Sequence, residues 1–342
     1  MRIATPLAYA TDPRAGADAV AAWEDDGLDV VWVSEAYGFD APSIMGYLAA
    51  KTTRMQIGSA ILPIYSRTPA LLAQTAAGLD AVSGGRAILG LGASGPQVIE
   101  GWHGVAYDRP LARTREVIGI CRQVWRRETL TNDGVYRLPL PAGEGTGLGK
   151  PLKLLTRPVR DSIPIYVASL GDRNVRMTAE LADGWLPFLY DPSRAADVWG
   201  DALAAGRSKR PGDLAPLEVV AGGPLAIGPD VTGLRDLARP LIALYVGGMG
   251  AKGRNFYHDL LCRYGFDAEA DRIQDLFLAG RRAEAEAAVP AELLERTSLI
   301  GPESYVRDRV QAYRDAGVTI LNVTPLGPDP RRQIAAVKAM AQ

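Results

Sequence analysis

The chain has 342 residues and a net charge of −1 at pH 7, with two cysteines and two histidines. A chain this close to neutrality, without a concentrated basic patch, is not expected to bind nucleic acid. Because Cys121 and Cys262 lack metal-like spacing and His103 and His258 are the only histidines, we expect no metal site and assign the chemistry to an organic cofactor.

The first residues of the chain predict neither export nor membrane insertion. Asp12-Pro13 interrupts this segment before any apolar run is long enough for a signal sequence. The longest apolar run, at residues 241–250, is roughly half the length needed to cross a bilayer. We therefore expect a cytoplasmic protein with no membrane partner.

Short β-rich apolar runs alternate with longer stretches of helical period, which is typical of parallel βαβ units. Eight strands joined by helices predict the α/β class and a closed (β/α)8 TIM barrel, with the active site at the carboxyl ends of the strands. The expected strands are Arg2–Leu7, Val30–Ser34, Gln56–Leu62, Arg86–Leu91, Pro164–Ala168, Gly184–Leu189, Leu217–Ala226 and Thr319–Thr324.

Capping residues followed by proline mark several helix starts, and glycines mark helix ends. The expected starts are Asp12-Pro13, Thr68-Pro69, Asp191-Pro192 and Gly301-Pro302, and the expected ends are Gly27, Gly206 and Gly317.

Two segments are longer than an ordinary connection within a single barrel domain of residues 1–342. The segment at about 129–162 is rich in glycine and proline, and we expect a loop or hairpin that acts as a lid over the barrel mouth. The segment at about 231–296 has several helical patterns, including Asp267–Leu278 and Arg281–Ala288, and predicts a helical insertion.

Four segments together resemble the luciferase-like monooxygenase superfamily: IGSAILP at 57–63, RTP at 67–69, LDAVSGGR at 79–86 and LGLG at 89–92. Three more resemble its branch that uses the deazaflavin coenzyme F420 and is related to methylenetetrahydromethanopterin reductase. These are VSEAYG at 33–38, SGPQVIEGWHG at 94–104 and GGMG at 247–250. The similarity covers nearly the whole chain.

The resemblance implies a cofactor across the barrel mouth, a luciferase-like fold and a homodimer. It also implies a non-prolyl cis peptide bond between Ala60 and Ile61, behind the deazaflavin ring. The expected activity is hydride transfer between coenzyme F420 and a small organic substrate, either to an activated C=C, C=N or C=O bond or from an alcohol. Two alternatives stay open, an FMN-dependent monooxygenase on the same barrel and a deazaflavin-binding protein without turnover.

The resemblance places the cofactor phosphate on the turn after the fifth strand, Ala168-Ser169-Leu170-Gly171-Asp172-Arg173-Asn174, which leads into a helix expected at 174–182. The free N–H groups at a helix start suit a phosphate. The alternative is an ordinary capped turn with Asp172 or Asn174 as N-cap. The other expected cofactor contacts are Ser34, Glu35, Ser59, Ala60, Ile61, Gly92, Ser94 and Gln97.

Two residues are candidates for proton donation. Glu35 stands where many relatives have an Asp-His pair, although Ala36 replaces the histidine; beside an apolar ring its neutral form would be favoured. The alternative is an ion pair with an arginine such as Arg67. His103 has a suitable ordinary pKa, or is a hydrogen-bonded loop residue.

Relatives often carry an acidic residue at the ring edge, where this chain has Ser94, Gly95 and Gln97, so the donor there is unassigned. The expected substrate pocket, with the barrel core as the alternative location, is formed by Tyr37, Trp102, Trp185, Tyr190 and His258.

Overall fold

Eight parallel strands form a closed barrel in the computed structural model, which describes residues 1–9 and 11–342. Around the barrel the order is β1, β2, β3, β5, β8, β9, β10 and β12, where β4 continues the third strand, and β12 pairs with β1 to close the ring. The expected TIM barrel is confirmed. The strands are β1 (Arg2–Leu7), β2 (Val30–Val33), β3 (Gln56–Ser59), β4 (Leu62–Pro63), β5 (Ala87–Gly92), β8 (Ile165–Ala168), β9 (Gly184–Leu186), β10 (Glu218–Ile227) and β12 (Ile320–Pro325).

One further strand, β11 (Leu299–Gly301), was not predicted. It pairs in parallel with the second half of β10, where Leu225 lies opposite Leu299, whereas the first half of β10 pairs with β9. Three apolar residues are too few to give a periodicity, so the sequence carried no signal for this strand.

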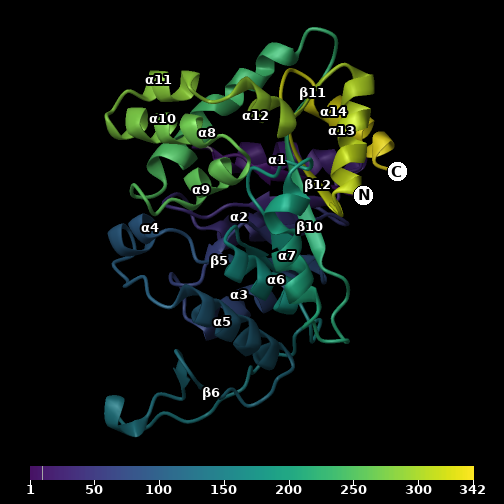
Figure 1. Cartoon of the computed structure of the whole chain (residues 1–342). Helices are drawn as coiled ribbons and strands as arrows, with labels where there is room; N and C mark the ends of the chain where they lie inside the picture. The colour runs from purple at the N-terminus through teal and green to yellow at the C-terminus, as the bar shows by residue number, and fades with distance from the viewer. Residues whose placement is uncertain (10) are drawn as a thin grey trace.

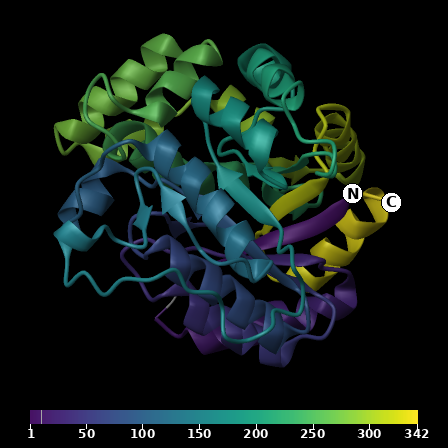
Figure 2. The ribbon, with the colours of Figure 1, turned by 90° about the horizontal axis from the view of Figure 1, so that it is seen from below.

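The helices surround the strands, as Figure 2 shows, and both termini lie close together. The N-terminal ammonium of Met1 donates to the carbonyl of Ala341 at 2.7 Å. The helices outside the longer insertion are α1 (Pro13–Ala22), α2 (Ala41–Lys51), α3 (Pro69–Ser83), α4 (Pro96–Gly101), α5 (Pro110–Trp125), α6 (Asp172–Leu181), α7 (Ala195–Arg207), α13 (Glu303–Asp315) and α14 (Pro330–Met340), with the 3-10 helices η1 (Trp23–Asp26) and η2 (Ala142–Glu144). None of the described helices is long and apolar enough to cross a membrane.

Most of the predicted helix boundaries are confirmed by the caps. The carboxylate of Asp12 accepts from the N–H groups of Arg14 and Ala15, and the hydroxyl of Thr68 accepts from Leu71. Gly27 and Gly317 follow helices in the left-handed conformation.

The predicted start of α7 is wrong, whereas its predicted end at Gly206 is correct to within one residue. The carboxylate of Asp191 accepts from Ser193 and caps a turn, so that α7 begins only at Ala195. Gly206 lies within α7, where a Cβ atom would come to 2.3 Å from the carbonyl oxygen of Arg176. Close packing of α7 on α6 therefore explains this glycine.

The barrel separates two apolar layers. A small inner cluster fills the barrel, and the larger outer core lies between strands and helices. Successive residues of a strand point to opposite faces, which explains why neighbours such as Trp32 and Val33 belong to different clusters. The inner cluster consists of Ala4, Val30, Trp32, Ile88, Tyr166, Val220 and Ile320.

The two long segments leave the barrel in different directions (Figure 1). The expected hairpin in the first consists of β6 (Asn132–Asp133) and β7 (Arg137–Leu138), and its chain projects at the bottom of Figure 1. Glu116 on α5 accepts from the N–H groups of Val135 and Tyr136, and Arg160 pairs with Asp80 on α3. These contacts to outer helices give no support to the expected lid.

The second segment is helical, as predicted. It contains η3 (Thr232–Ala238), α8 (Arg239–Gly248), α9 (Phe256–Arg263), α10 (Asp267–Leu278), α11 (Arg282–Ala287) and α12 (Ala291–Arg296), and it lies beside the barrel at the upper left of Figure 1.

Glu24 is expected to make part of the stability dependent on pH in acid. Burial raises the pKa of its carboxyl, but hydrogen bonds from the N–H groups of Met55, Arg54 and Thr53 lower it by more. The resulting pKa is about 2, compared with an ordinary value of 4.5. Since the folded-state pKa is depressed, the stabilisation is complete above pH 4.5 and is lost as the pH falls toward 2.

Glu24→Gln is therefore expected to lower the free energy of unfolding at pH 7 by roughly 2 kcal/mol, after allowance for solvent screening. Urea unfolding at pH 7, 4.5 and 3 tests this, because the difference between variant and wild type should shrink with acid. Parallel decline of the two proteins would contradict the assignment.

Candidate active site

The carboxyl ends of the barrel strands form an open mouth. Inside the barrel, residues of the inner cluster are at most 2% exposed, whereas Ala60, Ala168 and Leu186 nearer the strand ends are partly exposed. These partly exposed apolar side chains form the floor of the mouth. Among the described residues, no group of three or more His, Cys, Asp and Glu side chains could hold a metal ion.

The third strand of the barrel carries the cis peptide bond between Ala60 and Ile61 that the resemblance implied. This bond lies between β3 and β4, so the single strand expected at 56–62 is two strands in the structure. Two glycines of β5 make room for this bulge. A Cβ atom on Gly90 would lie 1.7 Å from the carbonyl oxygen of Ser59, and one on Gly92 would lie 2.9 Å from Ile61.

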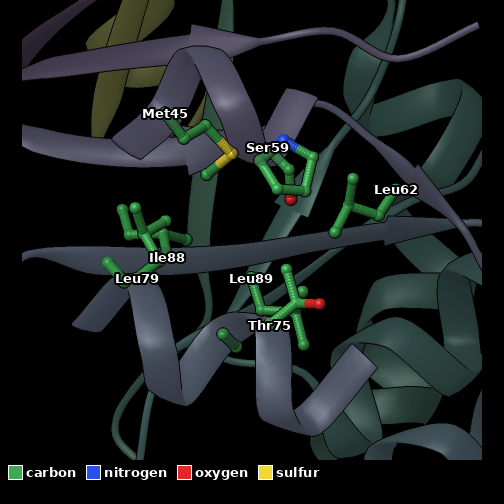
Figure 3. A pocket seen from close by; sticks show the side chains of 10 residues that line it. Met45, Ser59, Leu62, Thr75, Leu79, Ile88 and Leu89 are labelled. Atoms are coloured by element: carbon green, nitrogen blue, oxygen red, sulfur yellow. The ribbon is translucent and has the colours of Figure 1, made fainter. Parts of the chain in front are cut away.

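The side chain of Ser59 does not face the mouth, so its predicted contact with a cofactor has no support from the structure. Its side chain is fully buried, and its hydroxyl donates to the carbonyl of Gly90 at 2.8 Å and accepts from the N–H of Gly90. It lines a small apolar cavity between the barrel wall and helices α2 and α3, beside Met45 and Leu79 (Figure 3). The expected contact of Gly92 with a ring is replaced by its packing against Ile61.

Glu35 is half of an ion pair at the end of β2. Both of its carboxylate oxygens bind the guanidinium of Arg67, one of them at 2.9 Å, and the N–H of Ala41 donates to the same group at 2.9 Å. The side chains of Glu35 and Arg67 are only 7% and 16% exposed. All three contacts use the oxygens of Glu35 as acceptors, so the ion-pair alternative holds and the predicted proton-donor role of Glu35 is not supported.

The turn after β8 leads into the start of α6, where the resemblance places a phosphate. Gly171 is the N-cap and brings no side-chain cap, so neither Asp172 nor Asn174 has the capping role considered above. A Cβ atom on Gly171 would meet nothing within 4 Å. The amide oxygen of Asn174 is buried without a hydrogen-bond partner among the described residues, and Arg173 is exposed.

The remaining residues of this turn serve the core or the surface. Ser169 is buried and its hydroxyl bonds to Thr178 at 2.9 Å. Leu170 accepts at its carbonyl from the indole N–H of Trp199. Asp172 pairs with Arg263 at 2.9 Å.

The loop after β5 lies at the rim of the mouth. Ser94 has a positive φ of 57° and is exposed, and its carbonyl accepts from the hydroxyl of Tyr107 at 3.3 Å. Gln97, in the first turn of α4, is also exposed. His103 follows α4, and its Nε2 is buried without a partner among the described residues.

Two of the five predicted pocket residues lie at the rim, and three do not. Tyr37 and Trp102 are more than half exposed, with ring centroids 6.5 Å apart. Trp185 and Tyr190 are buried in the outer core, where Trp185 donates to the carbonyl of Ser169. His258 bonds through Nε2 to Asp271 on α10 at 2.9 Å, so it fixes the insertion.

An aromatic group that sequence reasoning missed stands over the mouth. Ring centroids of Phe188, after β9, and Tyr245, on α8, are 4.4 Å apart, and Tyr257 on α9 lies 4.7 Å from Tyr245. Burial raises the pKa of Tyr9, and an ionised Tyr245 would raise it further, so Tyr245 lies near Tyr9. Tyr9 follows β1 and lines a small cavity together with Ser34. The sequence signal was weak, because Tyr245 and Tyr257 are two of three tyrosines in the helical insertion.

The sequence also matches that of known proteins. The sequence model described as luciferase-like monooxygenase matches residues 1–319. The chain belongs to the luciferase-like monooxygenase family. This family member is 42% identical to a Mycobacterium tuberculosis protein named as a coenzyme F420-dependent oxidoreductase, Rv3520c, over 98% of the chain and 99% of that protein.

Two further similarities of this luciferase-like chain are to reductases. The chain is 28% identical to 5,10-methylenetetrahydromethanopterin reductase of Archaeoglobus fulgidus, over 92% of the chain and 90% of that protein. The solved coenzyme F420-dependent tetrahydromethanopterin reductase of Methanopyrus kandleri superposes with a TM-score of 0.79, at 23% identity, over 98% and 97% of the two chains. That structural likeness confirms the luciferase-like barrel.

Proposed function

We propose that the chain is a coenzyme F420-dependent oxidoreductase that transfers a hydride between the deazaflavin and a small organic substrate at the barrel mouth. The relative at 42% identity is named for this cofactor and aligns over almost the whole chain. The observation that carries the proposal is the start of α6, where an uncapped helix end lies beside the open floor of the barrel.

The residues at the mouth fit a flat cofactor with a phosphate. The open space above Gly171 leaves room for a group at the start of α6. The free N–H groups and the helix dipole favour an anion there. The partly exposed floor at Ala60 and Ala168 suits a ring face.

When bound, the reduced deazaflavin supplies a hydride, and the protein supplies position and a defined polarity. Gly171, Arg173 and Asn174 would hold the phosphate end, and Ala60 with Ile61 would support the ring. The Glu35–Arg67 pair keeps a fixed, internally neutralised charge beside the floor.

The proposal is tested by measuring the binding of F420 and of FMN to the purified chain, with the fluorescence of each cofactor as the readout. We expect F420 to bind and FMN to bind much more weakly. Arg173→Ala should weaken F420 binding about tenfold, because a charge-assisted contact is worth about 1.4 kcal/mol or more. Arg176→Ala, one turn further along α6, is the matched control and should change the affinity less than about twofold.

Equal effects of the two arginine variants on F420 affinity would mean that the phosphate does not bind at the start of α6. Preferential binding of FMN would instead favour the monooxygenase alternative. A protein that binds F420 but leaves the reduced form unoxidised by a broad panel of carbonyl and enone acceptors would be a deazaflavin-binding protein without turnover.

We further propose that the chain is a single-domain cytoplasmic protein that acts as a homodimer. The outer face of α3 supports the dimer, because its exposed positions, among them Leu71, Gln74, Gly78 and Val82, carry no charge. Leu71 and Val82 are 47% and 67% exposed, and exposed apolar faces of this kind mark protein contacts. Sedimentation should give twice the chain mass for the wild type and a monomer for Val82→Asp.

A further inference from the structure

The three aromatic rings over the mouth are arranged as one wall. Phe188 lies 4.4 Å from Tyr245 in a tilted arrangement, and Tyr257 meets Phe188 and Tyr245 edge to face at 5.5 Å and 4.7 Å. These distances are those at which aromatic pairs attract each other. The helices α8 and α9 that carry the two tyrosines also pack together (Figure 1).

A buried asparagine fixes the two tyrosines relative to each other. The amide of Asn255 donates to the carbonyls of Tyr245 and Val246 at 3.0 and 2.7 Å, and its oxygen accepts from the N–H of Tyr257 at 2.9 Å. Asn255 is 1% exposed, so these bonds form away from competing water. The wall is therefore preorganised.

The hydroxyl groups of this wall are available to a ligand. Elsewhere in the barrel, buried tyrosines donate within the chain, as Tyr190 does to Ala316 and Tyr264 to Leu189. Within the described residues, the hydroxyls of Tyr245 and Tyr257 have no such partner, and both side chains are partly exposed. Neither hydroxyl is among the fully buried unpaired atoms, so both are open to water or to an acceptor on a ligand.

Both hydroxyls are held in the donor form. Burial raises the pKa of Tyr245, and it raises the pKa of Tyr257 more strongly. An ionised neighbour would raise each further, since Tyr37 acts on Tyr245, and Tyr245 with Tyr107 acts on Tyr257. Each ionised tyrosine here would make ionisation of its neighbours less favourable. The hydroxyls of Tyr245 and Tyr257 therefore remain protonated donors at neutral pH.

Two acidic groups near the mouth are paired with arginines. Glu35 is neutralised by Arg67, and Asp108, next to Tyr107, is neutralised by Arg109 and Arg113. The rim is aromatic at Tyr9, Tyr37 and Trp102, which are about 60% exposed. A charged substrate would find no counter-charge among these rings and phenols, whereas a flat uncharged substrate could pack against them.

We propose that Phe188, Tyr245 and Tyr257 form a substrate wall that selects a flat, uncharged carbonyl compound and donates a tyrosine hydrogen bond to its oxygen. This inference rests on the proposed function and names the substrate class of the same site. A donor at that oxygen also stabilises the negative charge that develops there during reduction of the carbonyl.

A pair of probes of the same shape and different charge tests the selection. Benzylideneacetone is a flat neutral enone, and trans-cinnamate carries a carboxylate in place of the methyl ketone. We expect the F420-loaded chain to bind benzylideneacetone at least tenfold more tightly than cinnamate, measured by calorimetry. Equal binding, tighter binding of cinnamate, or no binding of the enone at millimolar concentration would overturn the inference.

Variants of the two tyrosines test the hydrogen bond. Tyr245→Phe or Tyr257→Phe should weaken benzylideneacetone about five- to tenfold, since one hydrogen bond contributes about 1 kcal/mol. The infrared C=O stretch of the bound enone should be lowered in the wild type and return toward its free value in the responsible variant. Tyr305→Phe, which removes a hydroxyl that donates to Glu295, is the control and should leave both values unchanged.

A C=O stretch unaltered by either tyrosine variant would refute the donor role. F420 affinity is measured on the same proteins, so that the two proposals fail separately. Loss of the proposed function would appear as wild-type protein that does not bind F420, whereas failure of this inference alone would appear as normal F420 binding without selection between the probes.

Discussion

Replacing Gly90 with alanine is expected to lower the free energy of unfolding by about 3 kcal/mol or more, because the new methyl group has no space. A Cβ atom there would lie 1.7 Å from the backbone oxygen of Ser59 and 2.8 Å from its carbonyl carbon. Backbone atoms cannot rotate away as the end of a side chain can. The hydroxyl of Ser59 also bonds to both backbone groups of Gly90, so β3 and β5 must move together.

Urea unfolding measures this effect, and F420 binding measured on the folded fraction reports the displacement of the barrel floor. Gly119→Ala is the matched control, because Gly119 is exposed in α5 and a Cβ atom there meets nothing within 4 Å. That variant should be more stable by about 0.5–1 kcal/mol. If Gly90→Ala were as stable as the wild type, the close contact between β3 and β5 would be refuted.

Replacing Asp80 with alanine is expected to cost about 3–5 kcal/mol, the range for breaking a buried ion pair. The side chain of Asp80 is fully buried, and it accepts from Arg160 at 3.0 Å and from the N–H of Ala87 at 3.2 Å. Its loss leaves two donors unpaired and releases the end of the projecting 129–162 segment from α3. Thermal and urea unfolding should both report the loss.

Three companion variants separate the buried pair from ordinary surface charge. Asp197→Ala breaks the exposed Arg194–Asp197 pair and should change the stability by less than about 0.5 kcal/mol. Arg160→Met combined with Asp80→Ala should cost less than the sum of the two single changes, because each single change leaves the partner unpaired. Additive losses would mean that Asp80 and Arg160 are not coupled.

The barrel could be predicted because its signals are local and repeated. Apolar runs such as Arg2–Leu7 and caps such as Asp12 and Thr68 report on their own neighbourhood, and both agree with the structure. β11 escaped because three residues are too few to show a period, and its partner on β10 is far away in sequence. Asp191 was misplaced as a helix start because turns and helices use the same cap.

The site could be predicted only in outline. The end of β2 was proposed because it follows a strand, whereas the cis peptide bond and the turn before α6 were proposed from the family resemblance. Which way a side chain points was not visible, so Ser59 and Trp185 were assigned to the mouth although both are buried behind it. The wall of Tyr245 and Tyr257 depends on how an insertion folds back over the barrel, and no local pattern encodes that.

A crystal structure of the chain soaked with F420 is the most direct test of the central claim that the barrel mouth binds a deazaflavin. We predict the ring against Ala60 and Ala168, the phosphate at the start of α6 beside Gly171, and the aromatic wall on the open side. Density for the cofactor elsewhere on the molecule, or a mouth that stays empty at saturating F420, would contradict the account.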